Sequence, residues 1–367
     1  MVQFFISILA VSGLGAVLAL FLEVADSYLG FYGTCGIHIN EGEKDLEVTG
    51  GGTLLSTLMD QGIFIPSACG GRGSCGYCKV KILEGAGLLL PTETPYLEPE
   101  EIKDSVRLSC QIKVRQDMNI EIPPELFLIK EFRARVEGLR DLTDEIKELR
   151  LRLVDPDAIA FKAGQYIQFQ VPEYEQCPES VYRAYSIASS AHESHSVNLV
   201  VTKVPGGLAT TFIHEVLKEG DEVTFNGPYG EFYLRESDRE IFFVAIGSGM
   251  APIVSILEQM AIEKIQRKAT FVFGARHKKD LFYMEEIEAL KQQIPHLEVI
   301  FTLSRSEEDD HWEGEKGRVT SVLERIIESG ESKEAYLCGN PAMVESCEEL
   351  LTKKGIPKEL IFFDKFG

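Results

Sequence analysis

The sequence is poor in positive charge. It contains 37 lysine and arginine residues against 58 aspartate and glutamate residues, which gives a net charge of −21 over 367 residues. A surface with this excess of negative charge repels the phosphates of nucleic acids, so we exclude nucleic acid as a partner. The charge suits a folded body that meets basic patches on other proteins, and the length suffices for two or three domains with proper cores.

Cysteine is also scarce, with eight residues in the whole chain. This number excludes a secreted scaffold held together by disulfide bonds. Four of the eight share one motif, and this grouping indicates a reducing compartment in which thiolates bind metal. Cys35, Cys177 and Cys347 have no partners by spacing, and we interpret them as ordinary thiols.

No lysine or arginine precedes Lys44, and residues 4–22 form a run of 19 residues without charge. A secretory signal peptide needs a basic start and a shorter apolar core, so we favour an uncleaved transmembrane helix. The run is near the ~20 residues with which a helix spans a bilayer. Because basic residues follow the run and none precedes it, we expect a single-pass protein of the inner (cytoplasmic) membrane with a cytoplasmic body. Residues 1–32 are assigned to this anchor and its tether.

The shared motif is Cys69-x5-Cys75-x2-Cys78-x31-Cys110, threaded with glycine in "CGGRGSCGYC". A zinc ribbon pairs two Cys-x2-Cys knuckles, and only one is present here. A redox dithiol would leave Cys69 and Cys110 unexplained. A [2Fe–2S] cluster takes four thiolates, and three ligands on one loop with a remote fourth is the ferredoxin pattern, although plant-type ferredoxins have four residues in the first gap. The spacing therefore favours a [2Fe–2S] cluster over zinc, with these four cysteines as metal ligands.

Three patterns follow the anchor. Residues 33–126 contain short strands and one helix around the cysteines, which predicts an α+β, ferredoxin-like (β-grasp) domain. Residues 127–236 contain short alternating runs, in which Leu149 and Leu151 alternate with charged residues, and this predicts an antiparallel β-barrel. In residues 237–367, continuous apolar runs alternate with helical patterns, which predicts a Rossmann-like α/β domain with a parallel sheet covered on both faces.

The stretch "YRAYSIAS" resembles the ferredoxin–NADP reductase superfamily, whose flavin domain carries Arg-x-Tyr-Ser/Thr on a barrel strand. The resemblance implies that Arg183 binds the FAD diphosphate, that Tyr185 lies against the flavin, and that Ser186 lies near flavin N5, where hydride arrives. A guanidinium fork suits a diphosphate, and a phenol ring stacks on a flavin. Thr210 and Thr211, in "GGLATTF", stand at a predicted helix start and are expected to bind phosphate.

The superfamily also binds the nicotinamide dinucleotide on a Gly-x-Gly-x-x-Pro turn, which "GSGMAP" resembles. Close backbone approach and a helix N-terminus favour a pyrophosphate there. By this resemblance Cys338 of "CGNP" lies beside the nicotinamide and Phe366 shields the flavin, so the predicted catalytic residues are Ser186, Cys338 and Phe366. The residues expected to bind the dinucleotide are Gly247, Gly249, Met250, Ala251, Pro252, Gly339 and Pro341.

The order of anchor, ferredoxin domain, flavin barrel and nicotinamide domain resembles the F subunits of the sodium-translocating NADH:quinone oxidoreductases, as do "SACGGRGSCGYCKVKILEG", "RLSCQ", "NGPYGEF" and "FGARHKKDLFY". The resemblance implies an NADH:acceptor oxidoreductase of the flavin iron–sulfur type. Its expected cofactors are FAD, a [2Fe–2S] cluster and NADH, and its expected partners are integral membrane subunits through which electrons reach quinone. Any ion transport would occur in those partners, because one apolar helix offers no polar ligand set.

One departure concerns the connection between "FKAGQYIQFQVP" and "YRAYS", where those subunits carry a long insertion and this chain is short. The acceptor therefore stays open between a sodium pump, another membrane complex and an oxygenase served by an anchored reductase. A redox-inert assembly subunit is disfavoured, because the cysteine, RAYS, GSGMAP and CGNP motifs are all intact.

The chemistry orders the cofactors. NADH delivers two electrons as hydride and the cluster accepts one at a time, so FAD is expected between them. Arg305 is a cation that could hold the 2′-phosphate of NADPH, but acidic residues surround it in "TLSRSEEDD". We therefore predict NADH as the donor.

Overall fold

The computed structural model describes residues 13, 15, 17–19, 32–307 and 311–365. The predicted anchor at 4–22 lies almost wholly outside these residues, and Phe366 lies outside them as well. No helix within the described ranges is both long and apolar enough to cross a membrane. Contacts divide the chain into two compact units, one ending at Leu128 and the other beginning at Ile129.

The first unit is a mixed sheet with a helix packed on it. Its strand order is β2-β1-β5-β3-β4, in which β1 and β5 are parallel and the other pairs are antiparallel. Alternation builds the core, because Ile37 and Ile39 of β1 are fully buried while His38 between them is exposed. The bounds are β1 Thr34–Ile39, β2 Lys44–Thr49, α2 Leu54–Asp60, β3 Lys79–Glu84, α3 Pro99–Lys103, β4 Val106–Leu108 and β5 Met118–Glu121, with 3₁₀ turns η1 Asn40–Gly42, η2 Thr94–Tyr96 and η3 Pro124–Leu128.

The second unit begins with an antiparallel sheet of order β10-β7-β6-β11-β8-β9. Its two edge strands meet through a bridge between Ile187 and Leu199, so the sheet curls into an incompletely closed barrel. Leu149 and Leu151 are fully buried, as the alternating pattern predicts. The bounds are β6 Lys130–Asp141, β7 Ile146–Asp155, β8 Tyr166–Val171, β9 Val181–Ser186, β10 Ser196–Thr202 and β11 Glu222–Tyr229, with α4 Leu208–Thr211 running into a π-helical turn, η4 Phe212–Val216.

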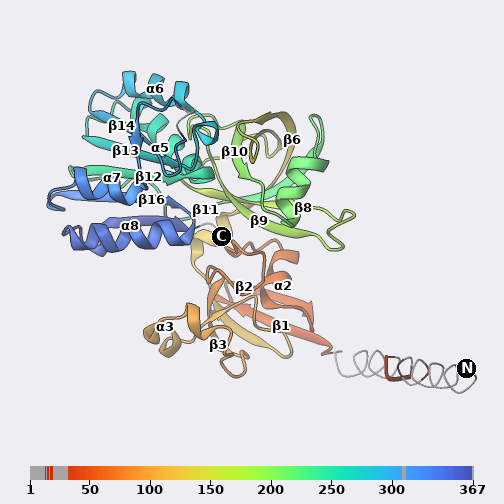
Figure 1. The fold of residues 1–367 in the computed structure, drawn as a ribbon. Coiled ribbons are helices and arrows are strands. Elements are labelled where there is room, and N and C mark those ends of the chain that lie inside the picture. Colours follow the sequence, from red (N-terminus) through yellow and green to blue (C-terminus); the bar gives the residue numbers. More distant parts are fainter. Residues whose placement is uncertain (1–12, 14, 16, 20–31, 308–310, 366–367) are drawn as a thin grey trace, which may run out of the picture. The chain divides into compact units, whose positions relative to one another are not determined.

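The rest of the second unit is a parallel sheet of order β15-β14-β13-β12-β16-β17 with helices on both faces (Figure 1). Its strands are β12 Glu240–Ile246, β13 Ala269–Ala275, β14 Leu297–Leu303, β15 Glu315–Lys316, β16 Lys333–Gly339 and β17 Ile361–Lys365. Its helices are α5 Met250–Ile262, α6 Met284–Gln293, α7 Val319–Ile326 and α8 Pro341–Lys353, with 3₁₀ turns η5 Gly247–Gly249, η6 Lys278–Asp280 and η8 Lys358–Leu360.

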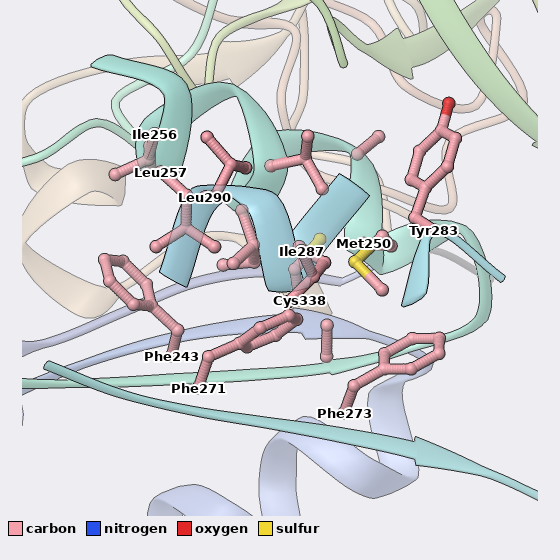
Figure 2. Close-up of a cluster of buried hydrophobic side chains, with 14 of the residues drawn as sticks. Phe243, Met250, Ile256, Leu257, Phe271, Phe273, Tyr283, Ile287, Leu290 and Cys338 are labelled. Carbon is pink, nitrogen blue, oxygen red and sulfur yellow. The ribbon is translucent and has the colours of Figure 1, made fainter. Parts of the chain in front are cut away.

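The continuous apolar runs of these strands have a simple cause. Phe243 of β12 packs under α5 and α6, whereas its neighbours Phe242 and Val244 pack against α7 and α8. Figure 2 shows the rings of Phe243 and Phe271 lying beneath the helices that carry Leu257 and Leu290. Since both faces of the sheet are buried, no strand position has to be polar, and the prediction of a doubly covered parallel sheet is confirmed.

The barrel and the parallel sheet of the second unit share contacts. Ile146 and Val200 of the barrel belong to the same buried cluster as Phe243. Polar bonds join the two parts as well: the Tyr283 hydroxyl donates to the Glu148 carboxylate. These contacts hold the expected flavin strand and the expected nucleotide turn within one body.

Candidate functional site

The four motif cysteines form two contacting pairs, Cys69 with Cys75 and Cys78 with Cys110. The Cys75 thiol donates to Cys69 and lowers the pKa of Cys69 to about 4. In the same way, the Cys78 thiol lowers the pKa of Cys110 to about 7, and the Gln111 amide donates to the Cys110 sulfur at 3.4 Å. A [2Fe–2S] cluster takes two protein thiolates on each iron, so a set of two pairs fits its donor requirement.

The loop between these cysteines depends on glycine. Gly70, Gly71, Gly73 and Gly76 all have φ between 65° and 85°, a left-handed region that other residues rarely adopt. A Cβ on Gly73 would also stand 2.5 Å from the Gln111 amide nitrogen. The chain can therefore curl tightly here only with glycine at these positions.

Backbone N–H groups in the loop point at sulfur. Those of Arg72 and Ser74 donate to Cys69, and that of Gly73 donates to Cys110. Such donors stabilise thiolates and tune iron–sulfur clusters. Among the described residues, no group of three or more His, Cys, Asp or Glu side chains is arranged so that it could bind a single metal ion. The residues present fit a two-iron cluster in donor type, in pairing and in the N–H groups directed at sulfur.

The predicted flavin residues lie on β9. The Ser186 hydroxyl is 5% exposed and has no hydrogen-bond partner within the described part of the chain. Buried polar atoms are nearly always bonded, so this hydroxyl is suited to a ligand atom. Tyr185 is half-buried, and its ring is edge-on to that of Phe169, with 6.4 Å between the ring centroids. Burial raises the pKa of its phenol. Arg183 donates to the Tyr182 carbonyl at 2.6 Å. An orphan hydroxyl, an aromatic ring and a guanidinium on one strand fit FAD.

The two predicted phosphate-binding threonines are buried, and one of them is already engaged. The Thr210 hydroxyl accepts from the Val204 N–H at 3.1 Å and contacts the Gly207 carbonyl at 3.3 Å. It therefore closes the turn before α4. The Thr211 N–H donates to the Gly207 carbonyl at 2.9 Å. A role for either residue on phosphate stays a prediction.

The predicted dinucleotide turn lies at the carboxyl ends of β12 and β16. Gly247 has φ 54° and turns the chain from β12 into α5. A Cβ on Gly249 would stand 2.2 Å from the Cys338 carbonyl oxygen, so only glycine allows the "GSG" and "CGNP" turns to touch. A Cβ on Gly247 would stand 3.9 Å from the Thr202 hydroxyl, which places this turn against β10 of the barrel. In α/β sheets, ligands bind at these carboxyl ends.

The residues after the glycines face inward. Met250, Ala251 and Pro252 are buried at the start of α5, and Figure 2 shows Met250 within the apolar cluster. Their side chains pack, so any contact with a dinucleotide would come from their backbone. At the other turn, Pro341 begins α8, and the Asn340 side chain accepts from the Met343 N–H at 2.9 Å.

Cys338 is fully buried at the end of β16. Burial, with the charge of Asp364, raises the pKa of this thiol well above its ordinary value, so the thiol is neutral. Asp364 stands opposite Cys338 in the register of β16 and β17, is 8% exposed, and has one carboxyl oxygen without a partner in the described part. Burial raises the pKa of Asp364 to about 7. Sequence reasoning missed this residue; a lone carboxylate in the apolar run "IFFDKFG" was the available signal.

We expect Asp364→Asn to change how stability depends on pH. The folded-state pKa of Asp364 is about 7 against an ordinary 3.8, so the folded protein holds a proton that the unfolded chain has released. The wild type should therefore lose up to about 1.4 kcal/mol of stability per pH unit as pH rises from about 4 to about 7, and the variant should not. When melting temperatures of both proteins are measured across this range, that of the variant should rise relative to that of the wild type as the pH increases. A difference in melting temperature that does not change with pH would contradict the raised pKa of Asp364.

Models of three protein families match the chain. The 2Fe-2S iron-sulfur cluster binding domain matches residues 37–115, the oxidoreductase FAD-binding domain matches residues 133–233, and the oxidoreductase NAD-binding domain matches residues 243–349. The predictions of a [2Fe–2S] cluster, FAD and NADH as cofactors are confirmed. The chain is a flavin-dependent NADH oxidoreductase that carries electrons to an iron–sulfur domain.

Solved structures that are similar over most of the chain include a cytochrome P450 reductase of Amycolatopsis, with a TM-score of 0.73 and 26% identity. A ferredoxin reductase of a carbazole 1,9a-dioxygenase gives a TM-score of 0.70 and 26% identity. Each comparison covers 91% of this chain and 99% of the other.

Curated relatives extend over nearly the full length. The F subunit of the Na(+)-translocating NADH-quinone reductase of Neisseria meningitidis is 36% identical over 391 residues, 96% of each chain. That of Haemophilus ducreyi is 35% identical over 406 residues, 100% of this chain and 99% of the relative. The chain thus belongs to the family of F subunits of the Na(+)-translocating NADH-quinone reductases.

Proposed function

We propose that this protein is the NADH-oxidising subunit of a membrane complex and passes electrons through FAD and a [2Fe–2S] cluster to integral membrane subunits that reduce quinone. The observation that carries the proposal is similarity along 96% of the chain to relatives that bear the name of a sodium-translocating NADH-quinone reductase. A shared cofactor domain alone would leave the acceptor open, whereas full-length similarity includes the segments outside these domains.

The proposed roles of the site residues follow from their surroundings. The unpartnered Ser186 hydroxyl donates to the flavin edge, and the half-buried Tyr185 ring packs against the flavin. The neutral Cys338 thiol lies beside the nicotinamide, where a thiolate would disturb the charge of the reacting ring. When bound, FAD supplies the conversion between two-electron and one-electron transfer, and the cluster supplies one-electron transfer. Cys69, Cys75, Cys78 and Cys110 hold the cluster.

We also propose that residues 4–22 anchor the protein in the inner membrane by a single helix, with the body in the cytoplasm. The length of this uncharged run supports the anchor, and the basic residues that follow it support the orientation. The proposed domain limits are 1–32 for anchor and tether, 33–126, 127–236 and 237–367 for the three folded domains.

One observation favours a second candidate, the reductase component of an oxygenase. The two solved structures described above are named for a cytochrome P450 and a carbazole dioxygenase. In addition, the alignment with the Haemophilus relative spans 406 positions although this chain has 367 residues, so the relative contains several tens of residues that this chain lacks. The absence of these residues would suit a different acceptor if they contact the partner subunits in the relative.

The two candidates differ in a direct experiment. The tagged full-length protein would be purified from its native membranes in mild detergent and supplied with NADH and a soluble quinone. The proposal predicts that integral membrane subunits co-purify and that Na⁺ stimulates quinone reduction by the assembly. Co-purification with oxygenase subunits, and no sodium-dependent quinone reduction, would support the second candidate instead.

A further inference from the structure

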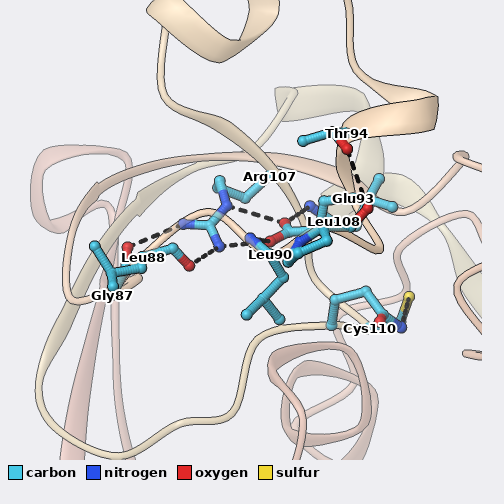
Figure 3. A network of polar contacts seen from close by, with 10 residues as sticks. Gly87, Leu88, Leu90, Glu93, Thr94, Arg107, Leu108 and Cys110 are labelled. Carbon is cyan, nitrogen blue, oxygen red and sulfur yellow. Dashed lines mark hydrogen bonds and ion pairs between the residues drawn. The ribbon is translucent and has the colours of Figure 1, made fainter.

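A buried ion pair lies in the first unit, close to the cluster cysteines. Arg107 and Glu93 meet through two bonds, from Nε to Oε1 at 2.9 Å and from Nη2 to Oε2 at 2.6 Å. The Glu93 side chain is fully buried and that of Arg107 is 8% exposed. Figure 3 shows the guanidinium facing the carboxylate, with Cys110 further along the segment that carries Arg107. Such bidentate pairs fix geometry as well as charge.

Further bonds tie both groups to the backbone. Glu93 accepts from the N–H groups of Leu90 and Leu108, each at 3.0 Å. Arg107 donates to the carbonyls of Gly87 at 3.2 Å and Leu88 at 2.9 Å. The pair therefore joins the loop at residues 87–93 to the end of β4. Buried charges this well bonded are costly to break, because removing one partner leaves the other uncompensated.

On one side, the ion pair fixes the position of the segment that ends in Cys110. Glu93 holds the N–H of Leu108, and the next residue, Ser109, donates from both its N–H and its hydroxyl to the Cys78 carbonyl, at 2.8 and 3.0 Å. The position of Cys110 relative to Cys78 thus depends on how Glu93 fixes the end of β4.

On the other side, Glu93 supports the turn that packs against the cysteine loop. Glu93 precedes the turn η2, and its carbonyl accepts from the Tyr96 N–H at 3.0 Å. The Tyr96 side chain packs on Gly76, where an added Cβ would stand 3.0 Å from the Tyr96 Cβ. Gly76 lies between Cys75 and Cys78. Glu93 therefore connects the two parts of the ligand set: its carboxylate holds the segment of the remote ligand, and its backbone carbonyl holds the turn that packs on the loop with the other three.

We propose that Glu93 and Arg107 are positioning residues for the [2Fe–2S] cluster, which set the spacing of the Cys78–Cys110 pair against the loop before iron enters. This inference rests on the proposed function insofar as the four cysteines bind the cluster. Metal ligands keep a precise position only when the residues that support them are held in place by packing and hydrogen bonds. Loss of such support lowers metal affinity by about 10- to 100-fold.

The test measures how fast the full-length protein, purified without oxygen, loses its cluster to an excess of an iron chelator. Glu93→Gln keeps the size of the side chain and removes its charge, and Arg107→Met keeps the length and removes the fork. We expect each to speed cluster loss by about 10- to 100-fold. Arg107→Lys keeps the charge without the bidentate geometry and should fall between them and the wild type. If Glu93→Gln and Arg107→Met do not accumulate as folded protein, the rate of cluster loss from Arg107→Lys tests the inference instead.

Matched controls separate positioning from general stability. Arg267 and Glu334 form a comparably buried pair in the parallel sheet at 2.7 Å, with side chains 11% and 1% exposed. Arg267→Met and Glu334→Gln should lower the melting temperature while the cluster is lost at the wild-type rate. Cluster loss at the wild-type rate in Glu93→Gln and Arg107→Met would overturn the inference, and so would equal acceleration in all four variants. A wild type without any [2Fe–2S] spectrum would instead refute the proposed function.

Discussion

Replacing Cys110 by serine is expected to abolish the [2Fe–2S] cluster while NADH still reduces the bound FAD. Cys110 is the remote member of the buried pair with Cys78, and a serine oxygen there cannot replace a thiolate whose sulfur receives bonds from Gln111 and the loop. Because hydride enters through the second unit, only the exit of electrons should be lost. Iron analysis measures the cluster content, and visible spectra measure the reduction of FAD by NADH. Reduction of a one-electron acceptor measures the exit of electrons.

Cys35→Ser is the matched control for this variant. Cys35 is equally buried in the same unit, and its thiol contacts only the Tyr32 carbonyl at 3.8 Å among the bonds of the described residues. This control should keep full iron content and acceptor activity. A Cys110→Ser protein that retained two irons and the cluster spectrum would remove Cys110 from the ligand set and with it the pairing described here.

Ser186→Ala is expected to slow flavin reduction by NADH about 100-fold, as removal of one preorganised hydrogen-bond donor typically does. The Ser186 hydroxyl is buried without a partner in the described chain, so its bond is available to a bound flavin. FAD content should stay the same, because Arg183 and Tyr185 are untouched. Stopped-flow absorbance of the flavin after mixing with NADH gives the rate.

Ser190→Ala provides the comparison. Ser190 is similarly buried, but its hydroxyl already accepts from the His192 N–H at 3.3 Å. This variant should reduce its flavin at the wild-type rate. Equal rates in Ser186→Ala and the wild type would show that the orphan hydroxyl does not contact the reacting flavin.

The sequence was sufficient where a local pattern has one physical solution. The alternation around Leu149 and Leu151 allows only a sheet with one buried face, and these leucines are fully buried. The uninterrupted apolar run at Phe242–Val244 needs cover on both sides, and it has two cores. Likewise, the left-handed glycines of the cysteine loop follow from the need to fold three cysteines inward.

The sequence was insufficient where distant segments meet. Asp364 faces Cys338 only because β17 joins β16 in parallel at a particular register, which no local pattern encodes. Glu93 and Arg107 each look like ordinary surface charges in the sequence, and only the fold, which brings the loop at residues 87–93 against β4, buries them together. The bond of the Thr210 hydroxyl to the Val204 N–H in its own turn likewise depends on the folded loop, and the predicted role of Thr210 on phosphate stays a prediction.

In this protein, one chain carries electrons from NADH through FAD to a cluster, which we assign to the cysteine loop. Anaerobic titration of the purified full-length protein with NADH, followed by visible spectra and low-temperature EPR, tests this most directly. We expect bleaching of the flavin together with the rhombic signal of a reduced [2Fe–2S] cluster. Flavin bleaching without that signal would contradict it, because the cysteine pairs would then hold something other than the electron exit.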